Sequence, residues 1–333
     1  MKRPTSRIMT FLLGAALVAL VLASLAIGQL PFGLSEILRG VSGQADTSTT
    51  LILFDIRLPR SMAALSIGIV LGASGAALQG LLRNPLAEPG ILGISASAAF
   101  GATTALYFGY GALSPVIVPL AAISTALLAT GLMSIAAIRA RGVASLILVG
   151  VGLSSLAGAL MSLLLNFAPN PFSLADMVRW MLGSVANRSI NDLLYTLPLM
   201  LIGLIFLLVE RRSLSALSLG EESAHGLGVN LKRTRLFIIL GAGIASGASV
   251  ALGGAIGFVG MVAPHLVRPL TGYDPGRAVI PSALLGGMMV LAADMIVRVL
   301  PTPVELQLGV IIAIIGAPLF IWIAVKQGNI RHG

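Results

Sequence analysis

The residues of this sequence that could take part in chemistry are few, and most of them are arginines. Arg57 and Arg60 stand three apart in the segment RLPR, directly before a long apolar stretch. A guanidinium group binds carboxylates and phosphates through paired N–H donors, so this pair could recognise an anionic partner. The same side chains could equally anchor the chain by reaching lipid phosphates, and the sequence leaves both interpretations open here.

Asp294 and Arg298 form a second candidate, four residues apart within another apolar stretch. An acid four residues before a base is the favoured order for an ion pair on one face of a helix. A charge inside a membrane-spanning helix costs about 2.5–3.5 kcal/mol at the bilayer centre, so such residues are functional candidates by default. An ion pair that only seats the helix is the alternative.

The sequence lacks the motifs of the common catalytic sites, including GxxxxGK[ST], GxSxG and HExxH. It contains no cysteine, and its three histidines, His225, His265 and His332, are scattered. We therefore expect no enzyme activity, no cofactor and no metal site, and no nucleotide bound in the manner of a P-loop.

The composition indicates a membrane protein. Of the 333 residues, 57% are hydrophobic and only 10% are charged, with a mean hydropathy of +1.00, whereas soluble domains carry roughly 25% charged residues. The net charge of +9 does not indicate nucleic-acid binding, because the basic residues lie between apolar stretches rather than in one stripe. We expect an all-α, polytopic protein with a single transmembrane domain over residues 1–333.

Apolar stretches of about 20 residues, the length needed to span a bilayer, recur along the whole chain. The first follows the basic segment MKRPTSR, and its length favours a retained helix over a cleaved signal peptide. The predicted spans number about ten and cover residues 8–28, 61–81, 92–109, 114–136, 143–166, 191–209, 236–252, 258–271, 279–298 and 306–325.

The distribution of basic residues predicts the orientation, because Lys and Arg concentrate on the cytoplasmic side of membrane proteins. With ten spans and a cytoplasmic N-terminus, fifteen of the 21 Lys and Arg residues lie inside. The six on the outer side are Arg39, Arg57, Arg60, Arg179, Arg188 and Arg298. This bias predicts that both termini are cytoplasmic and that a few arginines face outwards against the trend.

Two polar segments between the spans predict short helices outside the bilayer core. Residues 172–188 are amphipathic but too short and too charged to span, so we expect a helix at the outer interface. On the inner side, residues 210–235 form the longest polar stretch, in which Ser218 and Glu221 have the spacing of a capping box. Gly226 and Gly228 are positions where a helix could stop, which predicts a cytoplasmic helix over about 219–226.

Glycines four residues apart predict close packing between spans. The pairs are Gly68/Gly72, Gly243/Gly247 and Gly253/Gly257, and the last pair, together with Gly254, could also break a helix. A different signal lies between the second and third spans, where Asn84, Glu88 and two prolines predict a defined turn on the inner side.

Six segments, in order along nearly the whole chain, resemble the FecCD-type permeases, the membrane subunits of ABC importers for iron chelates, haem and vitamin B12. They are RLPR (57–60), GASGAALQGLLRNPLAEPGILG (72–93), LGEESAHGLGVN (219–230), GFVGMVAPHLVRPLTG (257–272), PSALLGGMMVLAADMIVR (281–298) and ELQLGVIIAIIGAPLFIWI (305–323). The resemblance implies the ten-helix type II ABC importer permease fold. It also implies a pair of permease subunits, two cytoplasmic ATPases that hydrolyse the ATP, and a periplasmic or lipid-anchored binding protein.

The resemblance further implies roles for individual residues. It assigns docking of the binding protein to Arg57, Arg60 and Arg298, which would face acidic side chains of that protein. It assigns coupling to the ATPase to the cytoplasmic loop at about 210–235. The expected contacts are Glu221, Glu222, Ala224, Leu227 and Gly228. It places the cytoplasmic gate near Asn84, Leu86, Val143 and Ala144.

The implied function is import of an iron chelate, either a ferric siderophore or haem, across the inner membrane. Vitamin B12 is the alternative cargo within the same family. A secondary transporter that needs no ATPase is an alternative of another class, and the predicted helix in 210–235 argues against it because such a transporter has no use for it. A membrane enzyme is a third possibility, disfavoured by the missing catalytic constellation.

Overall fold

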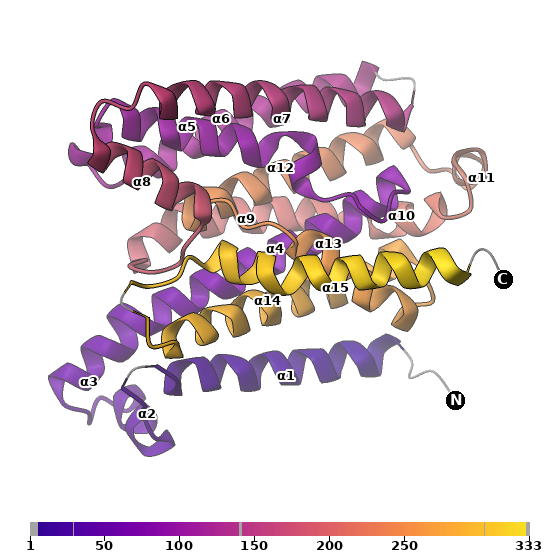
Figure 1. Cartoon of the computed structure of the whole chain (residues 1–333). Coiled ribbons are helices and arrows are strands. Elements are labelled where there is room, and N and C mark those ends of the chain that lie inside the picture. The colour runs from indigo at the N-terminus through magenta and orange to yellow at the C-terminus, as the bar shows by residue number, and fades with distance from the viewer. Residues whose placement is uncertain (1–5, 29, 140–141, 303, 331–333) are drawn as a thin grey trace.

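The computed structural model describes residues 6–28, 30–139, 142–302 and 304–330, and within these ranges the regular structure is helical throughout. The basic residues Lys2, Arg3, Arg141 and Arg331, and also His332, lie outside the described residues. The predicted all-α class is therefore confirmed. Figure 1 shows long helices lying side by side in one bundle, with short helices at its two ends.

Each of the ten predicted spans coincides with a helix. The longest are α1 (Ser6–Ala26), α4 (Leu58–Leu82), α6 (Ile117–Arg139), α7 (Val143–Asn166), α9 (Ile190–Val209), α12 (Leu231–Gly253), α14 (Pro275–Val299) and α15 (Leu308–Ile330). Among the described residues, seven helical stretches are long and apolar enough to cross a bilayer, and α15 contributes a shorter apolar stretch at Leu308–Leu319. The remaining two, α5 (Ile94–Tyr107) and α13 (Val259–Val267), are shorter than a bilayer is thick.

Short elements gather at the two ends of the bundle (Figure 1). One end holds α2 (Leu34–Val41), α3 (Thr47–Leu51) and α8 (Pro171–Leu182), and the π-helical turn η1 (Ile52–Arg57) joins α3 to α4. The other end holds α10 (Arg211–Leu217) and α11 (Glu221–Gly226), together with the start of α1 and the end of α15. The 3-10 turns η2 (Pro89–Leu92), η3 (Tyr110–Ala112) and η4 (Arg268–Leu270) complete the chain. The separation agrees with the predicted topology, in which 172–188 and 210–235 lie on opposite sides.

Close packing of α4 against α14 forms the centre of the fold, and it depends on glycine. A Cβ atom on Gly68 would lie 2.2 Å from the carbonyl oxygen of Gly286, and one on Gly72 would lie 2.1 Å from that of Ser282. Gly243 is equally tight, because its Cβ would lie 2.3 Å from Oγ1 of Thr130. Small residues let helix backbones approach where lipid gives no hydrophobic drive for association, and the predicted role of these glycines is confirmed.

The helix is interrupted between α12 and α13, as the glycines at 253–257 predicted. Helix α12 ends at Gly253, and Gly254 adopts a positive φ of 70° with no room for a side chain, since its Cβ would lie 2.3 Å from the Trp180 carbonyl oxygen. The amide of Ser184 donates a hydrogen bond to the Gly253 carbonyl oxygen at 2.8 Å. The break therefore joins the end of the central helix α12 to the α8–α9 connection.

Candidate functional site

A network of charged side chains links the C-terminal ends of α1 and α14 to the start of α4. Nε of Arg60 donates to Oδ1 of Asp294 at 2.8 Å, and Nε of Arg298 donates to Oδ2 of the same carboxylate at 2.7 Å. Asp294 is fully buried, and one anion thus holds two guanidinium groups. The predicted ion pair between Asp294 and Arg298 is confirmed, and Arg60 joins it from 234 residues away.

Arg298 also ties this network to the first helix. Its Nη1 donates to the Ser24 carbonyl oxygen at 2.9 Å, and its Nη2 donates to Oγ of Ser61 at 3.0 Å. The hydroxyl groups of Ser24 and Ser61 share a further hydrogen bond of 2.6 Å. Every guanidinium nitrogen of Arg298 therefore has an acceptor within the chain, which explains how this cation is tolerated in an apolar bundle.

Arg57 points inwards rather than to the outer surface. Its Nη1 donates to the carbonyl oxygens of Leu25 and Ala26, at 2.7 and 3.1 Å, and its Nη2 donates to the Leu30 carbonyl oxygen. The guanidinium carbon lies 4.5 Å from the centroid of the Phe32 ring. A cation at the last carbonyls of α1 complements the negative end of the helix dipole, so Arg57 closes the C-terminus of this helix.

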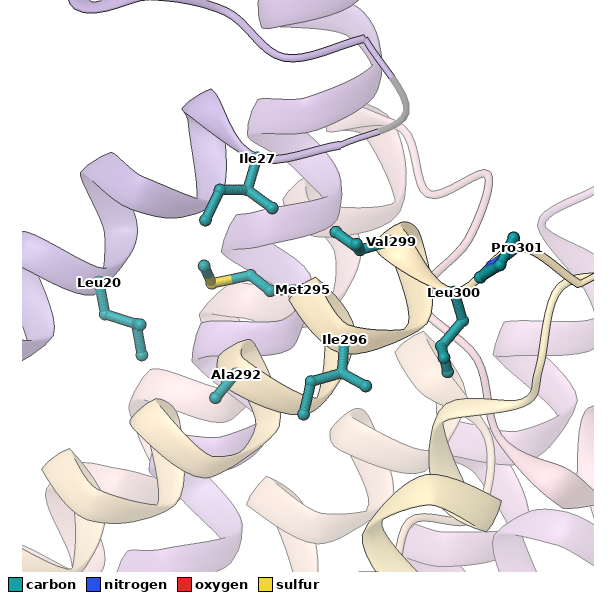
Figure 2. A pocket seen from close by; sticks show the side chains of 8 residues that line it. All are labelled: Leu20, Ile27, Ala292, Met295, Ile296, Val299, Leu300 and Pro301. Atoms are coloured by element: carbon teal, nitrogen blue, oxygen red, sulfur yellow. The ribbon is translucent and has the colours of Figure 1, made fainter.

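The apolar side of α14 lies opposite these charges. A groove of about 590 Å³ lies between α1 and α14, and the side chains that line it are apolar (Figure 2). Its lining side chains are Leu20, Ile27, Ala292, Met295, Ile296, Val299, Leu300 and Pro301. Helical spacing places positions 292, 295, 296 and 299 on this face, and Asp294 and Arg298 on the face towards α4. The groove is open and almost wholly apolar, and it therefore has the character of a lipid-facing surface.

At the other end of the bundle, α11 forms a short helix whose start differs from the prediction. The expected capping box is wrong: Gly220, with a φ of 111°, occupies the N-cap position, and Oγ of Ser218 donates to the Ser215 carbonyl oxygen instead. The predicted stop is confirmed. Gly228 has a φ of 85°, and Val229 and Gly228 donate backbone hydrogen bonds to the Ala224 and His225 carbonyl oxygens, which is the Schellman pattern.

The residues predicted for ATPase coupling divide into exposed and internal ones. Glu222 and Gly228 are exposed, and Leu227 is an apolar side chain that is 64% exposed. Ala224, by contrast, is fully buried in the chain's own core, and its methyl group is therefore not available for a direct contact with a partner in this structure. Glu221 is engaged internally, since Nη2 of Arg235 donates to its Oε1 at 2.8 Å.

A buried carboxylate that the sequence reasoning missed supports the same region. Glu210 is 3% exposed and follows the last residue of α9. Its Oε2 accepts a hydrogen bond from Oγ1 of Thr234 at 2.8 Å, and its Oε1 lies 3.5 Å from Nε of Arg233. The position of a lone acid directly after the apolar run 191–209 was the signal available. Through this contact the α9 end and the α12 start hold the segment that contains α10 and α11.

The predicted gate residues lie on neighbouring elements. Oδ1 of Asn84 accepts a hydrogen bond from the Leu86 amide at 2.9 Å, which forms the expected turn, and Leu86 is exposed. Val143 and Ala144 begin α7. The turn η2, which comes shortly after Leu86, packs on that helix, where a Cβ on Gly150 would lie 2.3 Å from the Ile91 carbonyl oxygen. The gate role of these four residues stays a prediction.

These features define a polytopic α-helical membrane protein, with an ion-pair network at one end of its bundle and a short polar helix at the other. The comparisons give the family: the FecCD transport family matches residues 16–326, and the chain belongs to it. The protein is thus a permease subunit of an ABC importer, a class in which the ATPase is a separate subunit.

Relatives and a solved structure agree with this assignment. The chain is 37% identical to the uncharacterized ABC transporter permease protein YvrB of Bacillus subtilis, over 86% of this chain and 82% of the relative. It is 38% identical to the vitamin B12 import system permease protein BtuC of Yersinia pestis, over 85% of this chain and 84% of the relative. A metal-chelate type ABC transporter in an inward-facing conformation has a TM-score of 0.85 at 33% identity, covering 95% of this chain and 98% of that one.

Proposed function

We propose that this chain imports an iron chelate, a ferric siderophore or haem, across the inner membrane, powered by a separate ATPase subunit. The observation that carries the ATPase-driven part of the proposal is α11, a short polar helix on the side with most of the basic residues. Its exposed Glu222 and Leu227 offer a contact surface, while the Arg235–Glu221 ion pair ties the helix to α12. A displacement of α11 would therefore be transmitted through this ion pair to α12, at the centre of the bundle.

The proposed partners follow from the two ends of the molecule. Two ATPase subunits would bind at α11 of two permease copies, on the cytoplasmic side, where both termini would also lie. A periplasmic or lipid-anchored binding protein would dock at the opposite end, near Arg60. In the undocked structure Arg57 and Arg298 are internal, so we propose that they position this surface, whereas Arg60, with a side chain 13% exposed, reaches it.

The exposed apolar surface of α7 is consistent with our proposals of a large cargo and of a second permease copy. This 24-residue helix contains no Asp, Glu, Lys or Arg, and apolar side chains including Leu148, Val151, Leu156 and Leu163 are exposed along it. A second copy facing α7 would enclose a wide path with few polar groups. Such a path suits a bulky chelate delivered by a binding protein, because the chelate must pass without binding tightly.

Vitamin B12 is the second candidate, and the identity of 38% to BtuC proteins favours it. The two cargoes are separated by uptake into proteoliposomes that contain the permease and its ATPase and hold ATP inside, with the binding protein outside. The proposal predicts accumulation of radiolabelled ferric siderophore or haem that excess unlabelled cobalamin does not compete away. Accumulation of cobalamin alone would transfer the assignment to the vitamin.

A further inference from the structure

Glu305 is an exposed carboxylate that pairs with an arginine of the proposed docking surface. It lies in the segment 304–307, directly before α15, and its side chain is 43% exposed. Its Oε1 accepts a hydrogen bond from Nη2 of Arg60. Val304 and Leu306 on either side are also exposed, and Glu305 is therefore held by this ion pair on an otherwise open segment.

The two partners of Arg60 differ in how easily they could be replaced. Asp294 holds Nε from a fully buried position and also pairs with Arg298, so no outside group can reach it. Glu305 holds the Nη2 end from the solvent side. Exposed ion pairs contribute little net stability, because water competes for both partners. The Glu305 contact is thus the exchangeable one.

The charge balance of the network shows what would replace it. The cations are Arg60 and Arg298, and the anions are Asp294 and Glu305. If Glu305 moves away, one positive charge stays at the outer surface without a carboxylate. Nε of Arg60 would still be bound to Asp294, while its Nη2 would be free to bind the carboxylate of an incoming Asp or Glu side chain.

We propose that Glu305 is an internal stand-in for a carboxylate of the binding protein, and that docking displaces it from Arg60. The inference rests on the proposed function, because it names the regulation of the same docking surface. The undocked permease keeps Arg60 neutralised and the segment 304–307 tied to α4. The docked permease gives Arg60 a partner carboxylate and releases this segment.

The released segment leads directly into α15. Gly309, in the first turn of that helix, packs where a Cβ would lie 2.3 Å from the Leu182 carbonyl oxygen, and its amide donates to the Gly183 carbonyl oxygen at 3.4 Å. Glu305 and Gln307 also line a cavity of about 450 Å³ beside Trp180. Loss of the Glu305 contact would therefore free the residues that lead directly into the packing of α15 against the end of α8.

The test is the affinity of the purified binding protein for the permease–ATPase complex in lipid nanodiscs, measured by biolayer interferometry. Glu305→Gln removes the competitor, and we expect the Kd to fall by about threefold to fivefold, the range that an exposed ion pair supplies. Asp55→Asn is the matched control: it removes one exposed outer carboxylate that lies in η1, and we expect its Kd to equal that of the wild type.

The possible outcomes separate this inference from the proposed function. An unchanged or weaker affinity of Glu305→Gln, beside tight wild-type binding, would overturn the stand-in role alone. An equal gain in Asp55→Asn would also overturn it, since the effect would then be general electrostatics. Failure of the wild-type complex to bind its binding protein would overturn the proposed docking and the inference together.

Discussion

Arg235, in the first turns of α12, donates a hydrogen bond of 2.8 Å from Nη2 to Oε1 of Glu221, the first residue of α11. The contact connects a short helix at one end of the bundle to one of the most buried of its long helices. Helix α12 packs against α4, α6 and α9 and ends at the Gly253–Gly254 break beside α8. The Glu221–Arg235 contact and α12 therefore form a direct route by which a displacement of α11 can be transmitted across the protein.

This route predicts a charge-swap result. Glu221→Arg or Arg235→Glu alone places like charges together, and we expect cargo imported per ATP hydrolysed to fall by about fivefold, equivalent to about 1 kcal/mol. The double variant restores the pair in reverse and should recover most of the loss. Measurement of uptake and hydrolysis in the same proteoliposomes checks this, and a double variant no better than the single ones would refute the ion-pair link.

The burial of Arg57 predicts that it stabilises the fold. Arg57→Gln removes charge-assisted hydrogen bonds to the last carbonyls of α1, and we expect a loss of about 2 kcal/mol in stability. Thermal unfolding in detergent measures this, with the exposed outer Arg39→Gln as the control. Unaltered stability of Arg57→Gln, combined with lost binding of the binding protein, would instead show that Arg57 contacts the partner directly.

The glycine contact between α4 and α14 predicts a steric effect at one position and none at another. In Gly68→Ala the new methyl group would lie 2.2 Å from the Gly286 carbonyl oxygen, and we expect destabilisation of about 1–3 kcal/mol or more, as for other overpacked cores. Gly131→Ala in α6 is the matched control, because its Cβ meets nothing within 4 Å. Equal melting temperatures for the two variants would contradict the packing.

The absence of cysteine from the chain allows a direct test of orientation. A single cysteine replacing Ser48 in α3 should react with a membrane-impermeant maleimide added to the periplasmic side of intact cells. One replacing Glu222 in α11 should react only after the inner membrane is opened. Labelling of both from the same side would show that the two ends of the bundle in Figure 1 do not lie on opposite faces of the membrane.

Sequence reasoning predicted the helices well where local composition decides the structure. The predicted span 143–166 coincides with α7, because a basic loop and a glycine precede it, and Asn166 and Pro169 mark its end. The break after Gly253 was also predictable, since a positive φ at Gly254 needs no distant information. The capping box at Ser218 failed because the Ser218 hydroxyl turns back to Ser215, and spacing alone does not reveal that choice.

The sites were predictable only in part, because their partners are distant in the sequence. The Asp294–Arg298 pair follows from helical spacing, but Arg60 and Glu305 reach it from α4 and from the segment before α15. No periodicity relates these positions. The same applies to Arg57, which was predicted to face a binding protein but whose side chain turns to the end of α1.

The claim that a separate ATPase drives this permease through α11 is tested most directly by comparing two energy sources. Proteoliposomes with permease, ATPase and binding protein should accumulate the chelate when ATP is trapped with the ATPase. An imposed proton or sodium gradient without ATP should give no uptake. Leu227→Asp, placed on the exposed end of α11, should lower ATP-driven uptake at least tenfold, a loss of about 1.4 kcal/mol or more in coupling. Gradient-driven uptake without ATP, unaffected by Leu227→Asp, would contradict the account.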